Sequence, residues 1–161
     1  MAGNTASDWL PPVEFYFRVD FQNMNGQMFK TSFAEVGGIG WKFTLEETPG
    51  NSNGKHKRPT SVGYDQLTLK RPLMPLTEEF AKWVETCLKL MFLPGGSKTV
   101  ADKKACDVIV KLLDQSGQPV AAWSCNHAFP VKYSLGGLKS DHNGLAVESI
   151  DLVYSRLERL K

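Results

Sequence analysis

The sequence lacks the features that define several large protein classes. Its 161 residues include only three cysteines, Cys87, Cys106 and Cys125, and no two have the spacing of a zinc or redox motif, so we predict reduced thiols. No apolar run reaches the roughly 18 to 20 residues that a membrane helix needs. Residues 1–12 are polar and hold no basic residue, which argues against a signal peptide. The net charge is only +2, whereas a dedicated nucleic-acid-binding domain usually has a marked basic excess.

Motifs for catalysis or ligand binding are also scarce. Residues 95–99 (GGSKT) end like a phosphate-binding loop, but a serine precedes the lysine and no strand precedes the segment. Cys125 and His127 share one face of a predicted strand, but a metal site needs two further ligands. Asp141 and His142 lie in a turn-rich loop. We therefore predict no catalytic residue, no metal and no cofactor, and a protein that is not an enzyme.

Alternation of apolar and polar residues dominates the chain. Phe15, Phe17, Val19 and Phe21, for example, lie on one side of a predicted strand, which is typical of a half-buried strand. The same pattern and the turn residues between its repeats predict about seven strands, at residues 14–21, 29–36, 41–46, 64–71, 107–113, 120–129 and 147–157.

One segment has helical periodicity instead. Apolar residues recur at three- and four-residue steps from Phe80 to Met91, after a predicted N-cap at Thr77. Residues 97–105 and 130–144 have neither period and predict loops. Because strands do not alternate with helices, we predict a mainly β fold: an antiparallel β-sandwich or barrel with one flanking α-helix. We expect a single domain over residues 1–161, whose first 13 residues form a flexible N-terminal segment.

Residues 48–63 predict a long projecting loop. The segment is rich in proline and glycine, has no periodicity and separates two strands that we expect to pair with each other. It also contains the one concentration of basic residues in the chain, at Lys55, His56, Lys57 and Arg58. This cluster is either a solvated loop tip or a contact for an acidic partner surface.

An ordered set of short stretches carries a family resemblance. Residues 126–133 (NHAFPVKY) are followed by residues 143–152 (NGLAVESIDL). The front half has three further stretches and a helix tryptophan: FYFRV at 15–19, FAEVGGI at 33–39, LTLKR at 67–71, and Trp83. In this order and spacing, over residues 14–157, the chain resembles the tail-tube family of contractile phages and contractile injection systems.

The resemblance implies a structural subunit that forms six-membered rings stacked into a hollow inner tube. Its implied partners are further copies of itself, a contractile sheath protein, baseplate or hub and cap proteins, and cargo or DNA passing through the lumen, with no membrane insertion. It also implies assembly in the bacterial cytoplasm, as part of a phage tail or of an injection particle that is released from the cell.

Two departures leave the exact role open. Residues 46–50 (EETPG) replace a Tyr-Arg-x-Gly step that is common in the family, and Pro72 stands where a glycine often follows Arg71. A baseplate-proximal, tube-initiating paralogue is therefore an alternative to the main tube subunit. From other classes, a monomeric small-ligand-binding β-barrel and a flavin-binding barrel enzyme are the competing hypotheses.

The resemblance and the alternation together suggest three surfaces. If Trp41, Phe43 and Leu45 face the core, and Leu67 and Leu69 do so on the next strand, the polar residues that alternate with them are candidates for the tube lumen. These are Lys42, Thr44, Glu46, Gln66, Thr68 and Lys70. The outward face of the helix is a candidate contact for the sheath, through Glu78, Lys82, Glu85 and Lys89, with Glu79 beside them. The basic cluster is expected to bridge to a neighbouring subunit or ring, with Glu14, Asp20 and Asp151 as candidate acceptors.

Overall fold

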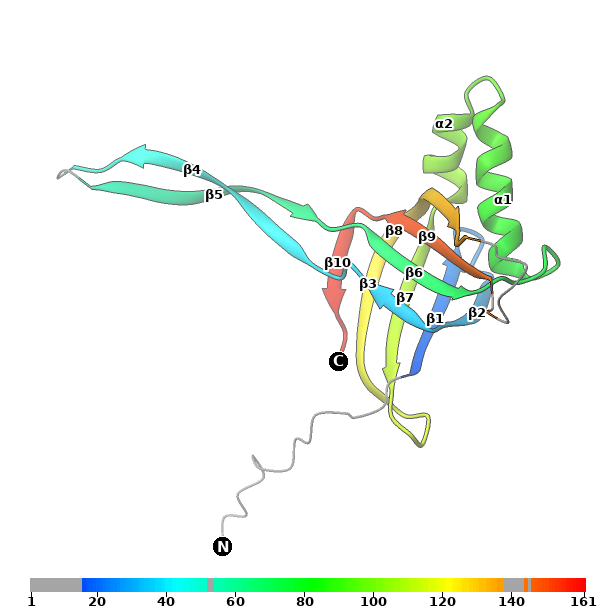
Figure 1. The fold of residues 1–161 in the computed structure, drawn as a ribbon. Coiled ribbons are helices and arrows are strands. Elements are labelled where there is room, and N and C mark those ends of the chain that lie inside the picture. Colours follow the sequence, from blue (N-terminus) through cyan, green and yellow to red (C-terminus); the bar gives the residue numbers. More distant parts are fainter. Residues whose placement is uncertain (1–15, 52–53, 138–143, 145) are drawn as a thin grey trace, which may run out of the picture.

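A computed structural model describes residues 16–51, 54–137, 144 and 146–161 of the chain. Figure 1 shows a curved β body, a helical region at one side of it and a long two-stranded hairpin that leaves the opposite side. The strands are β1 (Tyr16–Asn23), β2 (Met28–Phe33), β3 (Glu35–Gly37), β4 (Trp41–Pro49), β5 (Lys55–Tyr64), β6 (Leu67–Pro72), β7 (Cys106–Leu113), β8 (Pro119–Leu135), β9 (Val147–Val153) and β10 (Arg156–Arg159). The helical segments are α1 (Glu79–Met91), α2 (Gly96–Thr99) and the wider π-type turn η1 (Val100–Lys104). The predicted mainly antiparallel β fold with a flanking helix is confirmed.

The body is one curved antiparallel sheet. Its strand order is β2-β1-β7-β8-β9-β6-β3, and β10 pairs with the first half of β8. The long strand β8 pairs with β7 before a register shift at Pro130/Lys132 and mainly with β9 after it, so it joins the two halves of the sheet. The N–H of Ala34, between β2 and β3, donates to the carbonyl of Lys70 at 2.9 Å. This contact brings the two ends of the sheet together, as in a barrel.

The core lies between this sheet and α1. Phe21 stacks on Phe29 with ring centroids 5.0 Å apart and packs against Phe80 of α1 at 4.8 Å. Trp83 Nε1 donates to the carbonyl of Lys104 at 2.7 Å, which ties α1 to the end of η1. The amphipathic stripe that predicts the helix therefore meets the stripe that predicts the first strand.

The three cysteines are free and buried. Burial raises the pKa of Cys87 to about 11 and the pKa of Cys106 and Cys125 to about 12. The thiols are therefore neutral at physiological pH and behave as small apolar core residues. None of the helices in the described part of the chain has the length and apolar character that crossing a membrane requires.

Several predicted boundaries are wrong. The helix begins at Glu79 with Glu78 as its N-cap, because the Glu78 carboxylate accepts from the N–H of Ala81 at 2.9 Å, where Thr77 was expected to cap. Residues 97–105 are not a plain loop but contain α2 and η1, and the predicted irregular segment 130–144 begins with the end of β8. The described residues form ten strands rather than about seven. The predicted N-terminal segment 1–13, Glu14, Asp141 and His142 lie outside the described residues.

Residues 48–63 project from the body (Figure 1), but they are mostly β-strand, so the prediction of a loop there is wrong. β4 continues to Pro49 and β5 begins at Lys55, and the N–H of Gly50 donates to the carbonyl of Gly54 at 2.8 Å. β5 pairs with β4, while β6 pairs with β3 and β9. Pro59 fits because the register shifts between Thr44 and Leu45, and prolines are tolerated at such irregularities. The glycines and prolines that suppress the periodicity therefore mark a turn and a bulge, not a loop. We call the hairpin β4–β5, residues 41–64, the arm.

Candidate interaction surfaces

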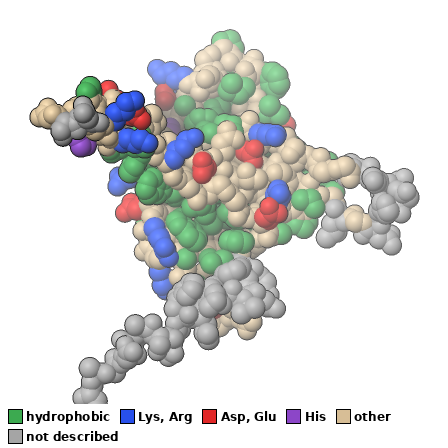
Figure 2. Space-filling model, turned by 60° about the vertical axis from the view of Figure 1, so that its left-hand side comes forward, with side chains coloured by type: hydrophobic (Ala, Val, Ile, Leu, Met, Phe, Trp, Pro, Cys, Tyr) green, Lys and Arg blue, Asp and Glu red, His purple; other side chains and the backbone are tan. Residues whose placement is uncertain are grey.

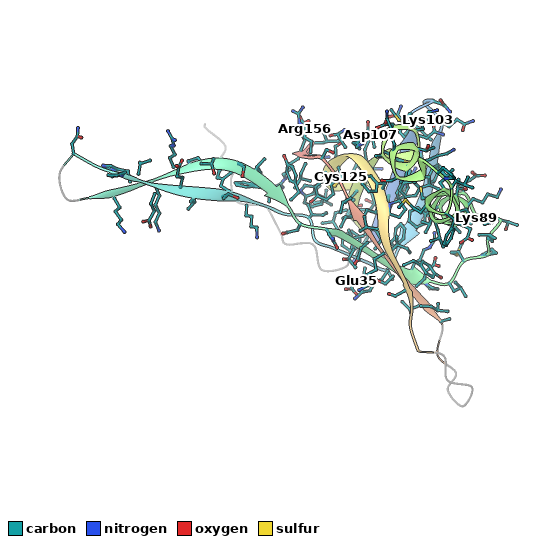
Figure 3. All side chains as sticks on the ribbon, turned by 90° about the horizontal axis from the view of Figure 1, so that it is seen from above. Glu35, Lys89, Lys103, Asp107, Cys125 and Arg156 are labelled. Atoms are coloured by element: carbon teal, nitrogen blue, oxygen red, sulfur yellow. The ribbon has the colours of Figure 1, made fainter. Side chains whose placement is uncertain are left out.

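The arm projects from the body, and both faces of its outer part are free of the described body (Figure 3). In Figure 3 its side chains stand out on both sides of the ribbon, and no other element of the described chain lies against its outer part. Neither β4 nor β5 contains a buried residue. A two-stranded hairpin is marginally stable by itself in water, so the arm is suited to a partner outside its own subunit.

One face of the arm is apolar. Directly paired residues of an antiparallel hairpin share a face, and Trp41, Phe43 and Leu45 pair with Tyr64, Val62 and Pro59 in that order. The rings of Trp41 and Phe43 lie 4.8 Å apart. Yet Trp41, Phe43, Leu45 and Val62 are 58%, 52%, 55% and 45% exposed, so the expectation that Trp41, Phe43 and Leu45 face the core is wrong. We call these four residues the apolar row.

The basic cluster lies along β5, toward the end of the arm. Figure 2 shows that basic and acidic side chains are gathered together on this projection. Arg58 pairs with Glu46 at 3.1 Å and Lys55 with Glu47 at 3.4 Å, both across the hairpin. The cluster is therefore partly neutralised by the arm itself.

The lumen candidates do not form one surface within the subunit. Lys42, Thr44 and Glu46 lie on the polar face of the arm, whereas Thr68 and Lys70 lie on β6 of the body, opposite the buried Leu67 and Leu69. Thr68 donates to Asp151 at 2.8 Å and Lys70 to Glu35 at 2.9 Å. Gln66 is exposed in the connection between β5 and β6. The predicted alternation on β6 is confirmed.

The outer face of α1 carries most of the predicted charges. Lys82 lies 3.7 Å from Glu79 and Lys89 lies 3.8 Å from Glu85, in pairs three and four residues apart along the helix. Lys89 lies at the outer edge of the molecule in Figure 3. Glu78 is the exception, because it is largely buried and pairs with Arg71 at 2.8 Å. The expectation that Glu78 points outward is wrong.

Arg71 holds α1 to the sheet through a buried network that sequence patterns did not reveal. Arg71 is 2% exposed, and its guanidinium donates to Glu148 of β9 at 2.6 Å, to Glu78 at 2.8 Å and to Thr31 Oγ1 at 2.8 Å. The guanidinium also lies 4.9 Å from the ring centroid of Phe80. A single cation therefore joins β6, β9, β2 and the start of the helix. Strand alternation puts Arg71 on the same face of β6 as Leu67 and Leu69. It cannot predict that two carboxylates from distant segments approach Arg71 there.

The electrostatics of the network favour the charged forms. Burial by itself raises the pKa of Glu78, but hydrogen bonds from Arg71 and from the N–H of Ala81, with the Arg71 charge, hold this pKa below its ordinary value of 4.5. Burial likewise lowers the pKa of Arg71, and the hydrogen bonds to Glu78 and Glu148 raise it above its ordinary value. The network is thus a structural ion cluster.

A groove of about 610 Å³ lies between α1 and the second half of β8, beside the connection from β6 to α1. Its lining is mainly apolar and includes Leu76, Val84, Leu88, Met91, Val131 and Tyr133. We call it the α1 groove. Among the described residues no group of three or more metal-ligating side chains is present.

Several solved structures share the fold of this chain. The chain is similar to a subunit in an extracellular contractile injection system, the PVC sheath–tube complex in its extended state, with 19% identity, 99% of this chain and 97% of that chain covered, and a TM-score of 0.73. It is equally similar to a chain of the tube-terminating cap of the anti-feeding prophage, with 19% identity, 100% and 99% coverage, and a TM-score of 0.74. A structure described as a type six secretion system protein is more distant, with 12% identity, 91% and 83% coverage, and a TM-score of 0.54.

At these identities the structural likeness shows a shared fold. Comparison with curated protein sequences finds no significant match. The family model described as T4-like virus tail tube protein gp19 matches residues 13–158, nearly the whole chain. The chain therefore belongs to the T4-like tail tube protein family, and it is a structural tube protein and not an enzyme.

Proposed function

We propose that this chain builds the inner tube of a contractile injection system or phage tail as hexameric rings stacked into a hollow tube. The single observation that supports this best is the arm, an amphipathic hairpin whose apolar row has no cover within the described subunit. In a tail tube protein, such an element fits a contact with another copy. When two different surfaces of the same chain contact each other, the copies form a closed ring if the rotation between neighbours brings the last copy back to the first. Otherwise they form an open filament.

The proposed partners follow from the structures that share the fold. A sheath–tube complex and a tube-terminating cap are among them, so we propose a sheath around the tube and a cap at its end. A baseplate or hub below the tube, cargo or DNA in the lumen and assembly in the bacterial cytoplasm complete the proposal.

The basic cluster is proposed to contact a neighbouring subunit or ring. His56 and Lys57 support this because, among the described residues, neither takes part in an ion pair with a carboxylate. The acceptor cannot be Asp20, which is buried and bonded to Lys111 at 2.7 Å. Asp151 remains a proposed acceptor, although it already accepts from Thr68.

The lumen is proposed to be lined by polar faces that do not bind cargo tightly. Thr68 and Lys70 support this, since they lie on the face of β6 away from the core and are already engaged with Asp151 and Glu35. Lys42, Thr44 and Glu46 on the polar face of the arm, and Gln66 at its base, are proposed to continue this lumen surface.

The first test is assembly of the purified 161-residue chain. We expect negative-stain electron microscopy to show rings, and tubes at high protein concentration, because the apolar row favours self-association. If ion pairs of the basic cluster join the rings, raising the salt concentration should shorten the tubes. A protein that stays monomeric at high concentration would contradict the proposal and favour the small-ligand-binding barrel.

The sheath contact is tested on the outer face of α1. We expect the double variant Lys82→Glu/Lys89→Glu to form normal tubes but to recruit the sheath protein poorly, because the reversed charges change only an exposed face. Each exposed ion pair contributes only about 0.2–1 kcal/mol, which suits a contact that must release on contraction. Co-expression with the sheath protein and counting of sheathed tubes by electron microscopy measures this. Lys98→Glu on α2 is the matched control, and unchanged sheathing in the double variant would argue against this face.

A further inference from the structure

The α1 groove is an exposed apolar surface without a cover in the described subunit. Leu88, Met91, Val131 and Tyr133 line it and are 54%, 55%, 46% and 50% exposed. Soluble monomers rarely expose large contiguous apolar patches, and such patches usually mark a binding surface. Its volume of about 610 Å³ is sufficient for several large side chains.

The charges in the groove restrict what it binds. Arg71 and Glu148 line it but bond to each other at 2.6 Å, and the hydroxyl of Tyr133 donates to Glu148 at 3.2 Å. The cation is also paired with Glu78. Because these buried charges already satisfy one another, an anionic or cationic ligand would have to disrupt the network. The groove therefore favours apolar side chains.

The apolar row of the arm has matching chemistry. It presents Trp41, Phe43 and Leu45 at alternate positions of one strand, and strand geometry spaces such residues about 6.6 Å apart. Aromatic side chains bury about 150–250 Å² each and dominate the energetics of interfaces. Within the part of the chain that the structure describes, no side chain covers the apolar row and none fills the groove.

The positions of the two surfaces make the contact intermolecular. In Figure 1 the arm leaves one side of the body, and α1 and α2 stand on the other side, so an arm cannot fold back into its own groove. Each copy presents one arm and one groove, and a contact between them is heterologous. Such a contact leaves a free arm at one end and a free groove at the other, and it repeats until a ring closes.

We propose that the apolar row of one copy packs into the α1 groove of the next copy, so that the arm–groove contact joins neighbouring subunits. This inference rests on the proposed function and specifies the interface through which the copies assemble. The polar face of the arm, with Thr44, then remains outside the contact.

Two complementary variants test the contact. Phe43→Glu disables the arm and keeps the groove, whereas Val131→Glu disables the groove and keeps the arm. We expect each variant alone to bind itself at least about 30-fold more weakly than the wild type, because a buried charge replaces a central apolar contact. Mixed in equal amounts, they should form a dimer of twice the 17.9 kDa subunit mass, through the one intact arm–groove pair, and no tubes. Light scattering after size-exclusion chromatography measures both states.

Matched controls separate the contact from general effects of charge. Thr44→Glu puts the same charge on the opposite face of the arm, and Lys82→Glu puts it on the outer face of α1. Both should assemble like the wild type, and thermal melting should show that all four variants are folded. If Val131→Glu folds and forms normal rings, or if the mixture gives no dimer, the inference is overturned.

Photo-crosslinking gives a readout that does not depend on disrupting the interface. A benzophenone amino acid in place of Phe43, in assembled protein, should form cross-links to α1 or to the second half of β8. Cross-links to another arm, or to the sheath protein in sheathed tubes, would assign the apolar row a different partner. Wild-type rings whose cross-links lie elsewhere would overturn this inference alone, whereas wild-type protein without rings would contradict the proposed function itself.

Discussion

Replacement of Arg71 by methionine is expected to lower the free energy of unfolding by about 3–5 kcal/mol. The substitution leaves the 4%-exposed carboxylate of Glu148 without its cation, and it removes the link from β9 to the start of α1. The contact of the guanidinium with the rings of Phe33 and Phe80 is lost as well. For a chain of this length the melting temperature should fall by about 6–20 °C, as measured by calorimetry or circular dichroism.

The double variant Arg71→Met/Glu148→Gln is the matched control. It removes the unpaired buried charge together with the cation, so it should be more stable than Arg71→Met alone. A loss below about 1 kcal/mol for Arg71→Met would show that the network does not hold the helix to the sheet.

A pH series checks the same network through Glu78. Its pKa is lowered in the folded chain, so its contribution to stability is fully present above its unfolded value of about 4.5 and is lost as the pH falls through the folded value. The wild type should therefore lose stability as the pH falls below about 4.5, more than Glu78→Gln does. Equal acid sensitivity in the two proteins would exclude this role for Glu78.

Removal of the arm is expected to abolish assembly and to leave the subunit folded. Replacing residues 43–62 by Asn-Gly joins Lys42 to Gly63, which pair across the hairpin, through a two-residue turn that suits antiparallel strands. The body should keep its stability to within about 1 kcal/mol, because β4 and β5 contribute no buried residue. Tyr64, which packs against Tyr154 with ring centroids 5.5 Å apart, is retained.

Electron microscopy tests the loss of assembly, and thermal melting tests whether the shortened chain stays folded. Rings and tubes should be absent at any protein concentration at which the wild type forms them, while the melting transition stays cooperative. If the shortened chain still forms tubes, the arm is not required for assembly. A shortened chain that fails to fold would show that the arm stabilises its own subunit, contrary to its exposure.

Local patterns in the sequence were enough to predict the body of the fold. The alternation that predicts strands correctly placed Val19, Phe21, Leu67 and Leu69 in the core. The turn residues between the predicted strands 107–113 and 120–129 form the turn from β7 to β8, where the Asp114 carboxylate accepts from the N–H groups of Ser116 and Gln118. The helix was predicted from its apolar stripe, although its cap was misplaced. Such features depend on residues close in the chain, so a single sequence contains them.

The candidate surfaces depended on contacts between distant segments. The same alternation that buries Leu67 and Leu69 leaves Trp41 and Phe43 exposed, because period two defines which side chains share a face and not what covers that face. Likewise, Arg71 is buried only because Glu78 and Glu148 approach it from separate elements.

The sequence by itself therefore determined the mainly β class, the core strands, the helix and the resemblance to tail tube proteins. Tertiary structure alone decided that residues 48–63 pair as strands of the arm, that the apolar row of the arm is exposed, and that a buried cation ties α1 to the sheet. The physical reason is that strand pairing and burial are set by which distant segments meet, and a local period contains no information about that meeting.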